Sequence, residues 1–442
     1  MSGPVSRAVV GRVVAVAAVA LGIGAIAIAN VAPVDRAGAQ TFTVEPPAPV
    51  VACPGAQTVP VGNVGSGGDL ASEPTIRTID AYSPGTQRAV GDGTAMDAIV
   101  GAQVERIADG DIAGWTAITC SAPAAEQWLV GGSTTLGSSA RLVLTNPSTA
   151  PSEVTVTLYG PLGKIDDTFV VSVAAESQTD RLIESIAASQ SSLVVHVAAT
   201  GPGVAAALQD SRLDGFQPAG TSWVGPSVAG ERLFIPGVGL DGVDGTVTLR
   251  LMAPEGARVD AMLVSQRGVE PWSTGTGITL EPGVVSDLAV PVSALGAIEI
   301  SADAPVFAAA RTVMTRLADE GLAGDVAADA TWVPAVEISP DVQVAVVPAD
   351  NARIAAYSPY STSVVVAHID GSTITTASVG ARTIQWIDLD APAGTVVTIE
   401  GEVAWSVVMA SDTGFIASLM PMRPSDNALE ATVVPQPYPP IR

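Results

Sequence analysis

Short runs of valine, threonine, isoleucine and leucine recur through most of this chain, and they alternate apolar with small or polar residues. In Val154-Thr-Val-Thr-Leu158, for example, threonines separate three apolar residues. Such an alternation of period two is typical of half-buried β-strands, whose successive side chains point to opposite faces of a sheet. Turn sequences such as Asn146-Pro147 separate the runs. The pattern therefore predicts an all-β fold.

The runs follow the same order three times. The copies open near Trp128, Trp223 and Trp332, which are 95 and 109 residues apart. Repeats of this length predict tandem domains, because solenoid and propeller repeats are about 20–50 residues long. Many short strands within about 100 residues favour an antiparallel, Ig-like β-sandwich in each copy, with a β-propeller-like closed array as the alternative. We expect the three tryptophans to pack at junctions between modules.

The first 39 residues have the composition of an export segment. Arg7 and Arg12 precede an uncharged apolar run over residues 13–34, and Ala37-Gly-Ala39 follows it. These are the parts of a signal peptide, but the run is also long enough to cross a membrane as a helix, which takes about 20 residues. We therefore expect either a single N-terminal transmembrane anchor or a secreted chain cleaved after Ala39. Both place the body outside the cytoplasm.

Cys53 and Cys120 are the only cysteines in the sequence. An even pair in an oxidising compartment predicts a disulfide. The alternative, a redox-active pair, would be expected at close spacing such as Cys-x-x-Cys. We therefore expect a structural disulfide that joins these two residues.

The predicted organisation has seven parts. They are a signal peptide or membrane anchor (1–39), a proline-rich tether (40–60), a partial, disulfide-linked unit (61–120), three β-sandwich modules (121–222, 223–331 and 332–425) and a C-terminal tail (426–442). The partial unit fits the pattern less well. Apolar residues over 95–107 have helix-like spacing and predict one short helix there.

Charge and residue counts exclude several classes of function. The chain has 44 acidic and 20 basic residues, a formal net charge of −24. Such a charge excludes nucleic acid as a partner, because nucleic-acid binding requires a basic face. Two histidines and two cysteines are too few for a zinc-rich scaffold.

No catalytic motif emerges from the remaining polar residues. His196 and His368 lie inside predicted strands, and no Gly-x-Ser-x-Gly motif accompanies either. His368 and Asp370 would share one face of a strand, which is the best available pairing. We expect no catalytic residues and no cofactor.

Acidic clusters could in principle bind Ca²⁺, which prefers oxygen ligands. They are Asp109-Gly-Asp111, Asp241-Gly-Val-Asp244 and Asp388-Leu-Asp390, and none matches an EF-hand loop. Aspartate and glycine are also ordinary turn residues. We therefore assign no metal site to them.

Three tryptophans outside the repeat pattern are candidates for contact with a ligand. Trp115, Trp272 and Trp386 lie near polar or glycine-rich segments. Exposed aromatic rings at these positions would suit a sugar.

One stretch resembles a known family. It runs from Cys120 to Gly132 through Trp128 and continues into Leu142-Val-Leu-Thr-Asn-Pro147, with Cys53-Pro-Gly55 upstream. These motifs resemble the uncharacterised exported proteins of actinobacteria grouped as domain-of-unknown-function family 5719, over roughly residues 50–425. The resemblance implies an exported, anchored, β-rich protein and no assigned activity.

Together these observations predict a non-enzymatic, extracytoplasmic scaffold or interaction protein of the cell envelope. Its partners would be an envelope protein or glycan, and the membrane through the N-terminal segment. The alternatives are a carbohydrate-binding accessory protein in envelope polysaccharide assembly and an acid-dependent glycoside hydrolase. The hydrolase would need two carboxylates on opposite sides of a sugar cleft, an arrangement that the sequence does not reveal.

Overall fold

The computed structural model describes thirteen stretches of the chain. They are residues 40–44, 50–58, 75–79, 100–107, 111–215, 217–239, 244–291, 296–317, 326–339, 343–349, 352–369, 372–422 and 429–433. The chain divides into two compact units, one of residues 1–46 with 428–442 and one of residues 47–427. In the first unit, β1 (Gln40–Val44) pairs antiparallel with β31 (Leu429–Val433). All other strands belong to the second unit.

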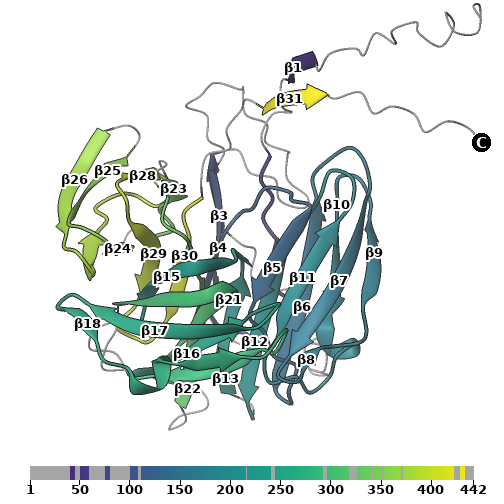
Figure 1. The fold of residues 1–442 in the computed structure, drawn as a ribbon, viewed down its shortest axis with the longest axis horizontal. Coiled ribbons are helices and arrows are strands. Elements are labelled where there is room, and N and C mark those ends of the chain that lie inside the picture. Colours follow the sequence, from purple (N-terminus) through teal and green to yellow (C-terminus); the bar gives the residue numbers. More distant parts are fainter. Residues whose placement is uncertain are drawn as a thin grey trace, which may run out of the picture. The chain divides into compact units, whose positions relative to one another are not determined.

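The first sandwich of the second unit lies between residues 126 and 227 (Figure 1). One sheet contains, in spatial order, β10 (Ser177–Leu182), β6 (Ser138–Asn146), β12 (Ala205–Asp214) and β13 (Gln217–Val224). The other contains β14 (Pro226–Ser227), β5 (Glu126–Val130), β11 (Val194–Ala199), β7 (Ser152–Gly160), β8 (Gly163–Lys164) and β9 (Phe169–Val173). Leucines and valines of both sheets form its core. Along β7 the predicted alternation places Val154, Val156 and Leu158 in that core.

The second sandwich shares one long strand between its two sheets. One sheet contains β22 (Val326–Pro334), β21 (Gly296–Leu317), β16 (Gly245–Met252) and β20 (Ser286–Val290). The other contains β15 (Gly230–Val238), β21, β17 (Ala257–Ser265), β18 (Gly268–Glu270) and β19 (Ile278–Leu280). The first half of β21 pairs with β15 and β17, and its second half pairs with β16 and β22. Strands that switch sheets in this way form the corners of sandwiches.

The third sandwich packs two four-stranded sheets. The strands of one are β23 (Gln343–Val346), β28 (Val396–Glu400), β25 (Ser363–Ile369) and β26 (Ser372–Val379). Those of the other are β27 (Thr383–Asp388), β24 (Arg353–Ser358), β29 (Ala404–Ala410) and β30 (Ile416–Leu419). Trp405 is fully buried in the core between them.

The part before residue 121 forms a three-stranded sheet of β2 (Thr75–Ile79), β3 (Val100–Ile107) and β4 (Gly114–Thr119). Val100, Ala102 and Val104 of β3 extend the core of the third sandwich. The helix predicted over 95–107 is therefore wrong for the described residues 100–107. Seven of the eight residues of β3 are buried, so both faces of the strand are covered and burial does not alternate along it.

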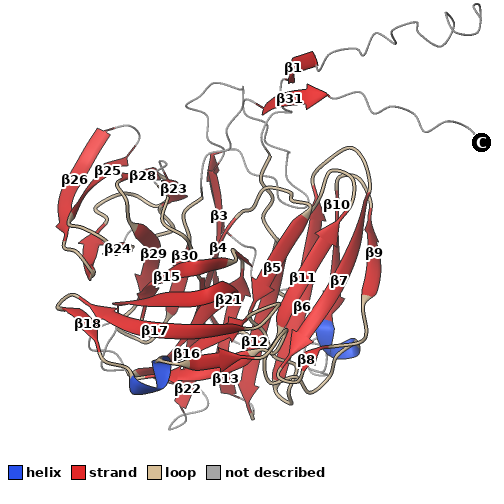
Figure 2. Cartoon of the chain, viewed as in Figure 1, coloured by secondary structure: helices blue, strands red, loops and turns tan. Residues whose placement is uncertain are grey.

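The fold class is confirmed as an all-β arrangement of antiparallel sandwich sheets. One-turn 3-10 helices at η1 (Ile183–Ser185) and η2 (Ser273–Gly275) are the helices of the described residues (Figure 2). The predicted limits of the modules stay predictions; those at 222/223 and 331/332 fall inside β13 and β22.

The predicted membrane anchor needs correction. Over the described stretches, no helix is both long and apolar enough to span a membrane. The structure thus contradicts a localisation based on a single anchoring helix. Residues 13–34, from which that prediction came, lie outside the described residues.

A disulfide joins Cys53 to Cys120, as predicted. It closes a loop of 67 residues, and both sulfurs are buried beside Val51. The bond fixes the segment 50–58 to the end of β4, where Ala52 and Ser121 also pair their backbones.

Replacing both cysteines, as Cys53→Ala with Cys120→Ala, should lower the free energy of unfolding by about 4 kcal/mol, because the unfolded chain loses its cross-link. Urea denaturation of both proteins, with and without reductant, measures this loss. Reductant should destabilise the parent and leave the double variant unchanged. Equal midpoints for parent and variant would contradict the prediction.

Candidate functional site

Four hairpins from different parts of the chain meet in the middle of the second unit. They are β3–β4, β12–β13, the second half of β21 with β22, and β29–β30. The second strand of each hairpin contacts the second strand of the next, in the order β4, β13, β22, β30 and back to β4. We call these four strands the central ring. Its members β13 and β22 lie parallel at Ala219 and Ala328.

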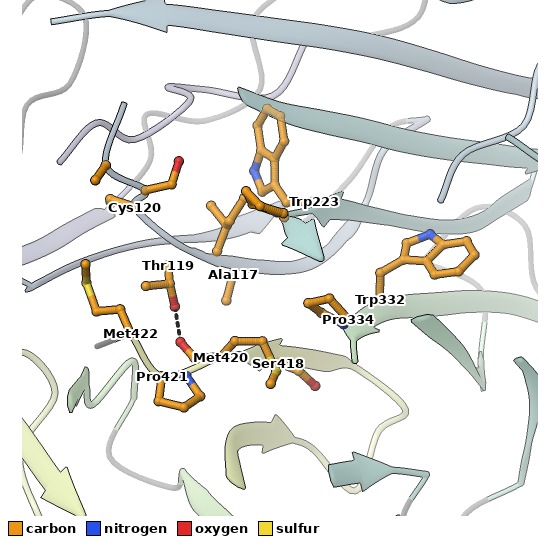
Figure 3. A pocket seen from close by; sticks show the side chains of 15 residues that line it. Ala117, Thr119, Cys120, Trp223, Trp332, Pro334, Ser418, Met420, Pro421 and Met422 are labelled. Atoms are coloured by element: carbon orange, nitrogen blue, oxygen red, sulfur yellow. Dashed lines mark hydrogen bonds between the residues drawn. The ribbon is translucent and has the colours of Figure 1, made fainter. Parts of the chain in front are cut away.

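A pocket of about 240 Å³ lies where the strands of the central ring end (Figure 3). All four strands, or the residues just after them, contribute to its wall. The lining residues are Ala117, Ile118, Thr119, Cys120, Ser121, Ala122, Trp223, Gly225, Pro226, Trp332, Pro334, Ser418, Met420, Pro421 and Met422. The only ionisable residue type among them is cysteine, and Cys120 is held in the disulfide. We call this cavity the central pocket.

The polar groups in the wall of the central pocket differ in how they are satisfied. Thr119 Oγ1 donates to the carbonyl of Met420, across the pocket wall in Figure 3. The indole nitrogen of Trp332 donates to Asp210 at 2.8 Å. By contrast, Trp223 Nε1 and Ser418 Oγ are buried without a hydrogen-bond partner. An unpartnered buried polar group costs about 1–3 kcal/mol, so the wall holds two uncompensated donors.

Buried charges fix Trp332 in place behind the pocket. Asp210, which accepts the indole N–H, also pairs with Arg212 at 3.0 Å. Burial opposes ionisation of Asp210, but Arg212 and Arg311 outweigh it and lower the pKa of this carboxyl. The guanidinium of Arg250 lies 4.9 Å from the centre of the Trp332 ring and forms a two-pronged ion pair with Asp287. Trp332 is therefore held at its nitrogen and at one face.

Asp329 joins three strands of the central ring at the end away from the pocket. This residue of β22 is fully buried, and its carboxylate accepts the backbone N–H groups of Trp115 on β4 and Ile416 on β30, each at 3.0 Å. Gly114 permits this approach, because a Cβ there would lie 2.5 Å from Asp329 Oδ1. Burial raises the pKa of Asp329 to about 7.

A second buried carboxylate holds the segment 50–58. Glu105 on β3 accepts the backbone N–H of Gln57 at 3.0 and 3.3 Å. Burial raises the pKa of Glu105 to about 8, even though these hydrogen bonds favour the ionised form. Both Asp329 and Glu105 thus bind protons more tightly in the folded protein than in the unfolded chain.

The three repeat tryptophans pack at junctions, as expected. Trp128 stacks between His196 at 4.0 Å and Phe307 of the second sandwich at 4.4 Å. Trp223 packs against Ile118 of β4, and Trp332 packs into the core of the first sandwich. Trp128 lies on β5, however, outside the central ring, so its structural position differs from that of Trp223 and Trp332.

The three tryptophans proposed for ligand contact do not form a platform. Trp272 is 4 % exposed in the core of the second sandwich, and Trp386 is 8 % exposed between the second and third sandwiches. Trp115 stacks on Phe415 at 5.5 Å, and the guanidinium of Arg106 lies 4.5 Å from its ring centre. Trp272 and Trp386 therefore present no exposed ring, because proximity in sequence says little about which way a ring points, and ligand contact at the three positions stays a prediction.

Where the structure describes them, the histidines and acidic clusters show no assembled site. His196 Nε2 is 3.1 Å from Glu126 Oε1 on the neighbouring strand β5, and its ring is stacked on Trp128. His368 lies on β25, while Asp109, Asp241 and Asp370 lie outside the described residues. Asp388 pairs with Arg353 at 2.7 Å. Within the described stretches, no group of three or more His, Cys, Asp or Glu residues could hold a metal ion.

Sequence reasoning missed the central pocket, although a signal for it exists. Each strand of the central ring ends at a proline or is followed by one within four residues: Pro123, Pro226, Pro334 and Pro421. Proline cannot donate to a sheet ladder and so marks strand ends. Recognising that a hairpin with a proline near its end occurs four times would have shown that the partial N-terminal unit and the three modules share one structural element.

These features define an all-β protein of three sandwiches with an apolar pocket at the junction of four hairpins. A family of unknown function, DUF5719, matches residues 78–400. The chain therefore belongs to this family, as its cysteine and tryptophan motifs suggested. No curated protein and no solved structure matches it.

Replacing Ser418 with alanine should stabilise the protein by about 1 kcal/mol, because the substitution removes a buried, unpartnered hydroxyl. Ser406→Ala is the matched control on the neighbouring strand β29. Ser406 is also buried, but its hydroxyl donates to the carbonyl of Pro236 at 3.0 Å, so its loss should destabilise the protein by a similar amount. Urea denaturation of the parent and both variants measures whether each substitution raises or lowers the free energy of unfolding. A destabilised Ser418→Ala protein would contradict the prediction.

Stability should fall as the pH rises from about 5 to about 8. Folded Glu105 retains its proton up to about pH 8 and folded Asp329 up to about pH 7, whereas the unfolded chain has already released both protons, since the usual pKa values are 4.5 and 3.8. Each group contributes a slope of up to about 1.4 kcal/mol per pH unit. Glu105→Gln keeps the acceptor for Gln57 and should reduce the slope of unfolding free energy against pH. If the unfolding free energies of parent and variant fall with pH at the same slope, the raised pKa of Glu105 does not cause the pH dependence and the prediction is wrong.

Proposed function

We propose that this protein is a non-enzymatic scaffold or interaction protein of the cell envelope, which binds an apolar group of its partner in the central pocket. The lining of the pocket carries this proposal. General acid–base and nucleophilic catalysis need a titratable or activated group at the reacting atoms. The described wall offers aromatic, aliphatic, methionine and proline side chains instead, with hydroxyls of serine and threonine. Such a surface suits binding.

The construction of the central ring supports the same function. Asp329 fixes the starts of β4 and β30 against β22, and buried charges fix Trp332. A pocket whose walls are already ordered loses little conformational entropy when a ligand enters, and this favours binding.

The disulfide supports a location in an oxidising compartment, because such bonds are rare in the cytosol of most organisms. The exported, actinobacterial setting implied by the family resemblance is part of this proposal. Membrane attachment through an N-terminal helix is not. Among the alternatives, the carbohydrate-binding accessory protein gains no support from Trp272 and Trp386, whose rings are buried. For the glycoside hydrolase, no pair of carboxylates faces the central pocket.

Filling the central pocket tests the proposed function. The neutral naphthalene dye prodan should bind the parent protein, with a blue shift of its emission. Ala117→Leu adds a larger side chain at a position that faces the pocket in Figure 3 and should weaken prodan binding at least tenfold. A fluorescence titration measures the affinity.

Ala174→Leu is the matched control, since Ala174 is exposed in the first sandwich and outside the pocket. It should bind prodan as the parent does. Met420→Trp provides a second filled pocket if Ala117→Leu fails to fold. Equal prodan affinity in the parent and a folded pocket variant would overturn the proposal.

A further inference from the structure

A second cavity, of about 310 Å³, opens between the second and third sandwiches. Its walls are Arg232, Phe234, Glu337, Ile338, Tyr360 and Glu402, and we call it the Tyr360 groove. Arg232 and Phe234 lie on β15, while Tyr360 and Glu402 lie in turns that flank β25 and β29. None of its residues lines the central pocket.

The aromatic ring in this groove is open to solvent. Tyr360 is 54 % exposed, the only large aromatic among the exposed hydrophobic residues of the described chain. The guanidinium of Arg232 lies 5.5 Å from the centre of its ring. Phe234 meets the ring edge-on, with centroids 6.5 Å apart. Tyr360 therefore offers the solvent-facing ring that Trp272 and Trp386 do not.

The charged side chains around Tyr360 have no fixed protein partners. Within the described residues, the side chains of Glu337, Glu402 and Arg232 form no hydrogen bond or ion pair, and the guanidinium of Arg232 lies over the ring of Tyr360. Arg353, by contrast, pairs with Asp388 at 2.7 Å. The Tyr360 groove thus combines acceptors and a donor that protein groups leave available.

The floor of the groove is rigid. Phe234 is buried and packs against Tyr357 of the third sandwich at 5.5 Å. Tyr357 in turn donates to Glu299 of the second sandwich at 2.7 Å, and Arg382 pairs with the same carboxylate at 3.0 Å. These contacts hold the two sandwiches together beneath the groove, so its walls are positioned before a ligand arrives.

We propose that the Tyr360 groove binds a neutral glycan through one pyranose ring. The two glutamates disfavour an anionic ligand, and the unpaired guanidinium of Arg232 disfavours a cationic one. A neutral sugar avoids both penalties. Its hydroxyls donate to the carboxylates and accept from the guanidinium, while its C–H face packs on the apolar ring of Tyr360.

This inference is independent of the central pocket and extends the function beyond apolar binding. Calorimetric titration of the full chain with maltotetraose, mannotetraose and tetra-N-acetylchitotetraose tests it. At least one of these neutral oligosaccharides should bind. Tyr360→Ala should weaken that binding at least tenfold, because the ring is lost, and Tyr360→Phe should weaken it less than threefold, because the ring remains.

Leu136→Ala is the matched control, since Leu136 is an exposed apolar side chain like Tyr360 and lies far from the groove in sequence. It should bind the sugar as the parent does, and prodan binding should be equal in all four proteins. Failure of all three sugars to bind, or equal affinity in Tyr360→Ala and parent, would overturn the proposal. Tighter binding of a tetralysine or tetraglutamate peptide in the same groove would also overturn it.

Discussion

The central pocket depends on a carboxylate at the opposite end of its walls. Asp329 on β22 accepts the backbone N–H groups of the second residue of β4 and the first residue of β30. Without it, two buried N–H groups would lose their partners, which costs free energy comparable to two lost hydrogen bonds. Both β4 and β30 begin beside Asp329 and end at the pocket. Their fixed starts therefore determine where Thr119, at the end of β4, meets Met420, just after β30.

Local pattern predicted the strands well wherever one face of a strand is buried and the other is not. The alternation of apolar with polar residues in β7 and β17 matches their burial. It failed for β3, which is covered on both faces by the third sandwich and by other parts of the chain. In β3 the polar residues Gln103 and Glu105 do alternate with Val100, Ala102 and Val104, but they are buried too and accept backbone N–H groups of the segment 50–58. Together with the apolar residues before the strand, the spacing of Val100, Val104 and Ile107 then resembles that of a helix.

The central ring could not be predicted in the same way. Its contacts join residues far apart in the chain, such as Asp329 with Trp115, 214 positions away. The sequence around either residue does not specify this pairing. Gly114 reflects it only in lacking a Cβ, which would lie too close to the carboxylate of Asp329. The same limit explains the tryptophans. Trp272 and Trp386 are recognisable as aromatic residues near polar neighbours, but their burial is decided by strands that the neighbouring sequence does not contain.

The positions of the arginines affect the charge around the two candidate binding surfaces, the central pocket and the Tyr360 groove. Arg250 and Arg316 are buried, and Arg212 and Arg311 serve the buried carboxylate of Asp210. Among the described residues four acids, Glu105, Asp210, Glu299 and Asp329, are buried as well, so the excess of acids over bases in the sequence remains on the exterior. Such a surface repels anionic partners at a distance. An uncharged central pocket and a groove suited to neutral sugars are the kinds of site that can work within that field, because their ligands gain nothing and lose nothing from it.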